Sequence, residues 1–174
     1  LWGHTDATAS SKAEQALQLS RQYVARNVSG VFFAPLEFEA DAPDVNRKIL
    51  AQLAAARIPV VLLDRRPSEA PERNRPDLVG INNRHAGYIA TEHLIRLGCR
   101  RIGFLAYHGS AATINARFAG YREALASHGI RSEDTALSFD ERAPDSSAVR
   151  GDIEAYVCLN DRIAGQLMHV FLSR

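Results

Sequence analysis

The sequence predicts an α/β protein built on parallel sheets. Two short apolar runs, residues 28–35 and 59–64, lack polar alternation, which is typical of strands buried on both faces of a sheet. They alternate with two segments of helical period, residues 10–27 and 43–58. This alternation is the pattern of a parallel sheet covered by helices on both faces. A chain of 174 residues can bury the core that such a fold needs.

Five elements are expected before residue 65. They are, in order, a strand end (1–8), a helix (10–27), a strand (28–35), a helix (43–58) and a strand (59–64). Ser11 and Glu14 have the spacing of a capping box and predict the start of the first helix. Pro35 ends the strand that follows, because proline cannot donate to a strand ladder.

Residues 65–77 interrupt this alternation. The segment "RRPSEAPERNRPD" contains three prolines and no apolar period, so it predicts a long loop that leads directly into a strand at residues 78–82. We interpret this loop as a crossing between two lobes. The predicted lobes are residues 1–81 and residues 82–174.

The regular pattern resumes after the loop. The expected elements are a helix (85–98), a strand (100–107), a helix (114–129), a strand (154–161) and a helix (162–174). Gly98 predicts a left-handed cap at the end of the first of these helices. The predicted inward face of that helix consists of Ala86, Ile89, Ala90, His93, Leu94 and Leu97. On this face His93 is expected to be a core histidine and not a ligand-binding one.

Composition and charge exclude several classes of protein. The net charge of +1 offers no strong field to hold a polyanion. No apolar run has the length of a membrane span, and the first residues lack the basic and apolar pattern of a signal peptide, so no membrane association is expected. The histidines and cysteines lack metal-ligand spacing, so neither metal nor cofactor is predicted. Cys99 and Cys158 are expected to be reduced thiols, which favours a cytoplasmic protein.

Candidate binding residues follow the predicted strands. In open parallel sheets, ligands bind at the carboxyl ends of the strands. Side chains at these positions donate or accept hydrogen bonds in planar geometry, as a hydroxyl-rich ligand requires. The candidates are Asp64, Asn82, His108, Asn160 and Asp161. Arg117 lies one helical turn beyond a strand, within reach of the same region.

Each of the main candidates has a structural alternative. Asn160 precedes a helix and can be an N-cap, a ligand contact or both. Asp64 can end its strand or pair with Arg65. Arg117 can be a solvated charge, half of a salt bridge, or a planar fork for a polar ligand.

Catalysis is not predicted. The sequence contains no G-x-S-x-G elbow, no P-loop and no G-x-G-x-x-G after a strand. Asp6, Asp64 and Asp161 could converge, but a shared fold does not establish catalysis. We therefore expect a binding protein and not an enzyme.

Four stretches of the chain resemble one known family. They are "IPVVLLDRR", "VGINNRHAGYIATEHLIRLGCRRIGFL", "ARFAGYREALASHGI" and "VCLNDRIA". In this order they are similar to the effector-binding domain of the lactose-repressor/galactose-repressor (LacI/GalR) family. The resemblance implies a fold of the type I periplasmic-binding-protein kind, with two Rossmann-like lobes that close on a small ligand, usually a sugar. It assigns ligand contacts to Arg117, Asn160 and Asp64.

The resemblance also implies partners and missing parts. The family's first strand and helix, its C-terminal third and its DNA-binding headpiece have no counterpart here, so the lobes are expected to be incomplete at both ends. DNA would be bound through a helix-turn-helix or a GntR-type winged helix outside this chain, by a homodimer. The alternative is a periplasmic sugar-binding protein of a transporter. On the regulator interpretation, Arg117→Ala is expected to abolish ligand binding with the fold intact.

Overall fold

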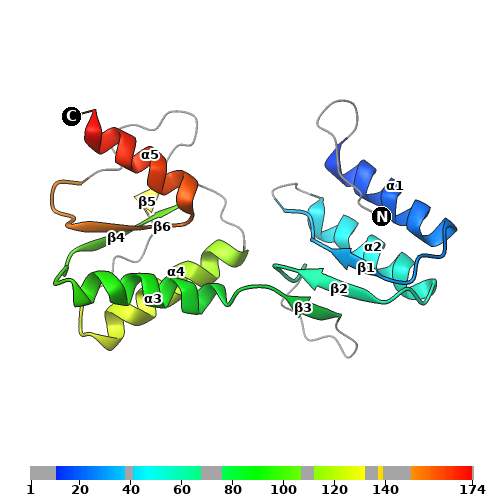
Figure 1. Ribbon diagram of the computed structural model, residues 1–174, viewed down its shortest axis with the longest axis horizontal. Coiled ribbons are helices and arrows are strands. Elements are labelled where there is room, and N and C mark those ends of the chain that lie inside the picture. Colours follow the sequence, from blue (N-terminus) through cyan, green and yellow to red (C-terminus); the bar gives the residue numbers. More distant parts are fainter. Residues whose placement is uncertain are drawn as a thin grey trace. The chain divides into compact units, whose positions relative to one another are not determined.

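The computed structural model describes residues 11–37, 41–67, 76–106, 112–131, 137–138 and 150–173. The chain divides into two compact units, Leu1–Ile81 (unit 1) and Asn82–Arg174 (unit 2) (Figure 1). The strand end predicted at residues 1–8 lies outside the described residues.

Unit 1 is a three-stranded parallel sheet with two helices. Its elements are α1 (Lys12–Ala25), β1 (Val31–Phe33), α2 (Ala42–Ala55), β2 (Val60–Leu63) and β3 (Asp77–Val79). The strand order is β1-β2-β3, and both pairs of neighbours are parallel. The register sets Phe32 opposite Val61 and Leu62 opposite Leu78. The parallel α/β prediction is therefore confirmed in this unit.

The helices of unit 1 begin and pack as the sequence predicts. The capping box of α1 is present: the backbone N–H of Glu14 donates to Ser11 Oγ at 3.2 Å, and the backbone N–H of Ser11 donates to Glu14 Oε2 at 3.3 Å. The apolar side chains of α1 and α2 meet in one buried cluster, formed by Ala13, Val45, Ile49, Leu53 and Ile58. Val31, Phe33 and Val60 of the sheet pack against this cluster.

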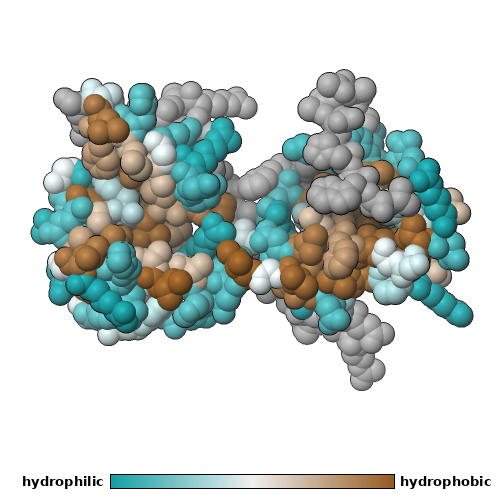
Figure 2. Space-filling model, in the orientation of Figure 1, coloured by the Kyte–Doolittle hydropathy of each residue, from teal (hydrophilic) through white to brown (hydrophobic). Residues whose placement is uncertain are grey.

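The opposite face of this sheet is open among the described residues. Phe32 alternates with Val31 and Phe33 and is 72% exposed, and Val79 of β3 is 61% exposed. Figure 2 shows hydrophobic side chains gathered over the strands of unit 1. The prediction of a sheet covered on both faces is therefore wrong for the described part of unit 1. Apolar runs predict strands that suit burial, but they do not specify which segment covers each face.

The predicted crossing at residues 65–77 is also wrong. β3 pairs with β2, so this segment connects two neighbouring strands of unit 1. The chain passes into unit 2 only after β3, at residues 80–82. A three-residue strand has too short a pattern to reveal its pairing partner from sequence.

Unit 2 is a second parallel sheet with helices on both sides. Its elements are α3 (Asn83–Arg96), β4 (Ile102–Ala106), α4 (Ala112–Ser127), β5 (Leu137–Ser138), β6 (Ala155–Cys158) and α5 (Asp161–Leu172). The strand order is β5-β4-β6. All five residues of β4 are buried, because α5 lies on one side of the sheet and α3 and α4 lie on the other (Figure 1). The left-handed cap predicted at Gly98 is confirmed by its φ of 98°.

α3 and α4 pack with their backbones in contact. A Cβ atom added to Gly87 would lie 2.0 Å from the carbonyl oxygen of Arg117, and one added to Gly120 would lie 1.8 Å from that of Arg84. Only glycine fits at both positions. Next to this crossing, the hydroxyl of Thr91 is buried and donates to the carbonyl of Gly87 at 2.8 Å.

This crossing turns α3 away from its predicted orientation, although Leu94 of the predicted inward face still packs against the core. Its buried face consists of Asn83, Gly87, Thr91 and Ile95. Ile89 and Leu97 of the predicted inward face are 49% and 68% exposed, and His93 is exposed as well. The prediction that His93 is a core histidine is therefore wrong. Two helix backbones can approach closely only where the side chains between them are small. The residues at such an interface therefore cannot be recognised from a stripe of apolar residues.

An aromatic cluster joins α4 to β4. The rings of Phe104, Phe118 and Tyr121 lie 5.2–5.7 Å apart, and the Tyr121 hydroxyl donates to the carbonyl of Ile102 at 2.7 Å. These distances suit favourable aromatic packing, and the buried hydroxyl has its partner. Tyr121 thus belongs to the buried core of unit 2, and Phe118 packs against it.

Glu154 joins the amino ends of β4 and β6. Its Oε2 accepts the backbone N–H groups of Arg100 at 2.7 Å and Arg101 at 2.9 Å. The Arg101 guanidinium lies 2.8 Å from Oε1. These N–H groups favour the carboxylate and lower the pKa of Glu154 below its ordinary value of 4.5.

We expect Glu154→Gln to lower the stability of unit 2 at neutral pH. A folded-state pKa below the unfolded value gives stability that is present above the unfolded pKa and is lost as the pH falls through the folded one. The difference between the wild type and Glu154→Gln should therefore shrink below pH 4.5. Urea denaturation from pH 7 to pH 3 measures this. A difference that stays constant across that range would contradict the role of the carboxylate. Asp44→Asn, which removes only an exposed pair with Arg47, is the control.

Candidate ligand-binding site

Arg117 is fixed within unit 2 by two uncharged acceptors. Its Nε–H donates to Asn83 Oδ1 at 2.8 Å, and an Nη1–H donates to the carbonyl oxygen of Leu159. The side chain is half-buried. Of the three alternatives for this arginine, the arrangement resembles a planar fork, with two of its five N–H donors bonded inside the protein. The structure gives Nη2 no partner among the described residues.

The packing of α3 on α4 determines the position of this fork. The glycine contact holds the backbone of Arg117 directly against Gly87. Asn83 lies one turn earlier on the same buried face of α3. The guanidinium therefore meets the Asn83 amide without leaving the interface between the two helices. Because Nε–H is a donor, it requires the amide oxygen, and not the amide nitrogen, of Asn83.

Asn160 is the N-cap of α5, as one of its alternatives predicts. Its Oδ1 accepts the backbone N–H of Ile163 at 3.0 Å. The Nδ2 group has no partner among the described residues. Leu159, whose carbonyl binds Arg117, is the preceding residue. The structure thus brings Arg117 and Asn160, two of the three main candidates, together at the end of β6.

We expect Asn160→Ala to lower the free energy of unfolding by about 1 kcal/mol, because it removes the cap of α5. Asn160→Asp keeps an acceptor oxygen for the Ile163 N–H and should retain most of that stability. Urea denaturation of both variants checks the cap. An equal loss in the alanine and aspartate variants would contradict it. If the Nδ2 group donates to a ligand, both variants should weaken ligand binding.

The remaining candidate residues are Asn82, Asp161 and His108. Asn82 is exposed and caps α3, since its Oδ1 accepts the backbone N–H of His85 at 3.0 Å. Asp161 is exposed at the start of α5 and accepts the backbone N–H of Arg162 at 3.0 Å. His108 lies outside the described residues. Both described side chains thus have a local structural role.

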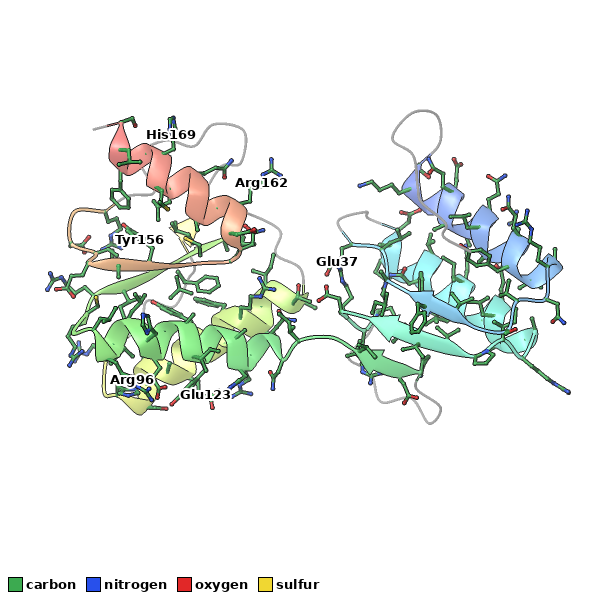
Figure 3. The ribbon with its side chains drawn as sticks, viewed as in Figure 1. Glu37, Arg96, Glu123, Tyr156, Arg162 and His169 are labelled. Carbon is green, nitrogen blue, oxygen red and sulfur yellow. The ribbon has the colours of Figure 1, made fainter. Side chains whose placement is uncertain are left out.

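Asp64 belongs to a separate charged group in unit 1. Its Oδ2 lies 3.2 Å from Nε and 2.9 Å from an Nη of Arg65. Arg65 also pairs with Glu37, which lies beyond the end of β1 (Figure 3). Burial lowers the pKa of Arg65 below its ordinary value, while the two carboxylates surround its cation. The predicted pairing of Asp64 with Arg65 is confirmed.

The backbone of Asp64 has a left-handed conformation. Its φ is 68°, and its N–H donates to the carbonyl of Val79 at 2.8 Å. A Cβ atom at Gly80 would lie 3.0 Å from the Asp64 Cα. The turn at Asp64 is therefore packed against the residues through which the chain leaves unit 1. Aspartate tolerates this conformation better than most residues, but at a cost.

Sequence reasoning placed Arg65 and Asn83 at the ends of predicted strands but did not assign them a ligand contact, and it did not select Glu37. Asn83 shares a face with Gly87 and Thr91 at a spacing of four, which would have indicated a helix interface of small and polar residues. Glu37 and Arg65 lie just after β1 and β2, as Asp64 does. Their opposite charges after neighbouring strands could have predicted this ion pair.

Three further features of the described residues are relevant to function. In the part of the chain that the structure describes, no three His, Cys, Asp or Glu side chains are grouped to hold a metal ion. None of the described helices has both the length and the apolar character needed to cross a membrane. Burial raises the pKa of the Cys158 thiol, in β6, to about 11.

The chain is similar to known regulators in sequence and in fold. It is 34% identical over 102 residues to the HTH-type transcriptional regulator GalR of Escherichia coli, covering 53% of this chain and 29% of that protein. It is 29% identical over 137 residues to the HTH-type transcriptional repressor PurR of Photobacterium profundum, covering 74% and 40%. Among solved structures, a complex of the transcriptional regulator CelR with cellobiose matches with a TM-score of 0.70 and 26% identity, over 92% of this chain and 49% of that one.

These matches agree with a family assignment over almost the whole chain. The chain spans less than half the length of the two curated relatives. Residues 8–172 match the family described as periplasmic binding proteins and sugar-binding domain of the LacI family. The matched region includes both units and all three main candidate residues. The chain therefore belongs to the family of periplasmic binding proteins and LacI-type sugar-binding domains.

Proposed function

We propose that this chain is the ligand-sensing domain of a DNA-binding transcriptional regulator. The observation that carries the proposal is the Arg117 fork, which is fixed by Asn83 and Leu159 while its Nη2 group has no partner among the described residues. The Asn160 amide nitrogen, next to Leu159, is a second donor of this kind. Planar donors held in place suit a ligand rich in hydroxyl groups.

The proposed ligand is a sugar. The family description names sugar-binding domains, and CelR is a relative of similar fold that binds cellobiose. Arg117 and Asn160 are the proposed contacts in unit 2, and Asp64 is the proposed contact in unit 1. Asn82, His108 and Asp161 are proposed as additional contacts. No catalytic step is proposed, since the matched relatives are named as regulators.

The proposed partner of the whole protein is DNA. Relatives that carry "HTH-type" in their names support a DNA-binding segment outside this chain. A homodimer and a cytoplasmic location are proposed on the resemblance to the LacI/GalR family alone. A ligand regulates such a protein only if it binds two states with different affinity. The alternative is a periplasmic sugar-binding protein of a transporter, because the family description includes periplasmic binding proteins.

A sugar screen tests the sensing function. The full-length protein would be melted with and without cellobiose, galactose and other common mono- and disaccharides. We expect at least one sugar to raise the melting temperature in a concentration-dependent way, because a ligand that binds only the folded state stabilises it. Absence of any shift across the panel would contradict a sugar as the ligand.

DNA binding distinguishes the two proposed roles. We expect the full-length protein to bind its own promoter at physiological salt, with an affinity that the sugar changes. This chain alone, with a net charge of +1, should bind only weakly and without sequence preference. A gel-shift assay compares the two. No binding by the full-length protein, with or without sugar, would favour the transporter alternative.

A further inference from the structure

Asn83 is the buried partner of the proposed ligand contact. Its side chain belongs to a residue that is only 7% exposed, at the first position of α3. It accepts the Arg117 Nε–H at 2.8 Å. A buried side chain that bonds a half-buried arginine can hold the plane of the guanidinium, because the bond to Nε lies in that plane.

The Asn83 bond and the Leu159 bond together leave the fork little freedom. Nε is bound on one edge by Asn83, and Nη1 is bound by the Leu159 carbonyl. The Arg117 backbone cannot move away from α3, since Gly87 and Gly120 already place the two helices in contact. Removal of the Asn83 oxygen releases one of two anchors and leaves the main chain in place.

We infer that Asn83 is a positioning residue for ligand binding: it fixes the Arg117 guanidinium so that its outer N–H groups face the ligand. This inference rests on the proposed sensing function. Asn83 does not itself touch the ligand. It holds the Arg117 side chain in place before the ligand binds. Binding then costs less conformational entropy.

The position of Asn83 gives this bond a second consequence. Asn83 is the second residue of unit 2, directly after the segment at residues 80–82 through which the chain leaves unit 1. A change in the hydrogen bonding of Arg117 therefore acts on the first turn of α3. A ligand that displaces the guanidinium would therefore alter its hydrogen bond to Asn83, next to the first residue of unit 2.

Chemical modification of arginine tests the inference directly. In the full-length protein, phenylglyoxal would label arginines, and mass spectrometry would give the labelling rate at Arg117. We expect Asn83→Ala to raise this rate about ten-fold, because a guanidinium with one anchor becomes accessible. Asn83→Asp keeps an acceptor oxygen and should restore the slow rate. Arg47, exposed on α2 in unit 1, supplies an internal standard whose rate should not change.

Thr91→Ala is the matched control for stability. Thr91 lies two turns further on the same buried face of α3 and has a bond of its own, to the Gly87 carbonyl. Its replacement disturbs the helix interface without removing a partner of Arg117. We expect a small loss of stability and an unchanged labelling rate at Arg117. A purely structural role of Asn83 would make Asn83→Ala behave like Thr91→Ala and would overturn the inference.

Titrations with cellobiose and galactose complete the experiment. For a sugar that binds the wild type, Asn83→Ala should weaken binding about ten-fold or more, and Asn83→Asp should recover most of the affinity. Faster labelling of Arg117 with unchanged sugar affinity would overturn the positioning role. If the wild type binds none of the sugars in the panel, the proposed ligand class fails, and the labelling rates alone decide whether Asn83 orients Arg117.

Discussion

Replacement of Gly120 with alanine is expected to destabilise unit 2 by about 3 kcal/mol or more, because the added methyl has no space. Its Cβ would lie 1.8 Å from the Arg84 carbonyl oxygen and 2.8 Å from the Tyr88 nitrogen. Both are backbone atoms of α3, so no side chain can rotate away. The two helices must separate, which also exposes the buried face of α3. Gly87→Ala should have a similar effect, because its Cβ would lie 2.0 Å from the Arg117 carbonyl oxygen.

Gly165→Ala is the matched control for this prediction. Gly165 also lies inside a helix, α5, but an added Cβ meets nothing within 4 Å. Alanine there should leave stability unchanged or raise it by up to about 1 kcal/mol, because it favours the helix. Urea denaturation of the three variants gives the comparison. Equal stability of Gly120→Ala and Gly165→Ala would show that the close helix contact is not required.

Arg117→Ala is expected to weaken sugar binding by about 2 to 4 kcal/mol, since it removes a charged fork. The sequence led us to expect no loss of stability, but the contacts of Arg117 change that expectation. The Asn83 oxygen and the Leu159 carbonyl both lose a donor, and Asn83 is buried. We therefore expect an additional loss of roughly 1 to 3 kcal/mol in the free energy of unfolding.

Arg117→Lys separates the two effects. A lysine ammonium is a point charge and cannot bond Asn83 and Leu159 while presenting a planar edge. It should recover part of the stability and little of the affinity. Calorimetric titration with cellobiose or galactose, below the melting temperature of each variant, measures the affinity. Unchanged affinity in folded Arg117→Ala would exclude Arg117 as a ligand contact. Arg47→Ala, at an exposed surface pair, is the control for the loss of an arginine.

Local signals in the sequence predicted much of each unit. The capping box at Ser11 and Glu14, the left-handed cap at Gly98 and the N-cap at Asn160 all occur as expected. These features depend on a few neighbouring residues, which a sequence displays directly. The parallel pairing also followed from apolar runs separated by helices.

Contacts between distant segments were the part that the sequence could not provide. The apolar stripe of α3 predicted that Ile89 and Leu97 face inward, yet both are exposed, because α4 packs on the face that contains Gly87. Similarly, the partners of Arg117 are 34 and 42 residues away along the chain. No local pattern specifies which distant carbonyl meets a guanidinium. The helix crossing at Gly87 and Gly120 brings Arg117 to Asn83, and the end of β6 brings the Leu159 carbonyl to it.

The left-handed turn at Asp64 has a consequence for how this protein would change under selection. A non-glycine residue at a φ of 68° carries a conformational cost that glycine would not. Selection for thermal tolerance alone would thus drive position 64 toward glycine and discard the carboxylate bonded to Arg65. Retention of aspartate there in a population evolving at high temperature would reveal a demand on the carboxylate that outweighs the strain. The residue at position 64 would thus indicate whether the carboxylate or the relief of backbone strain is under the stronger selection.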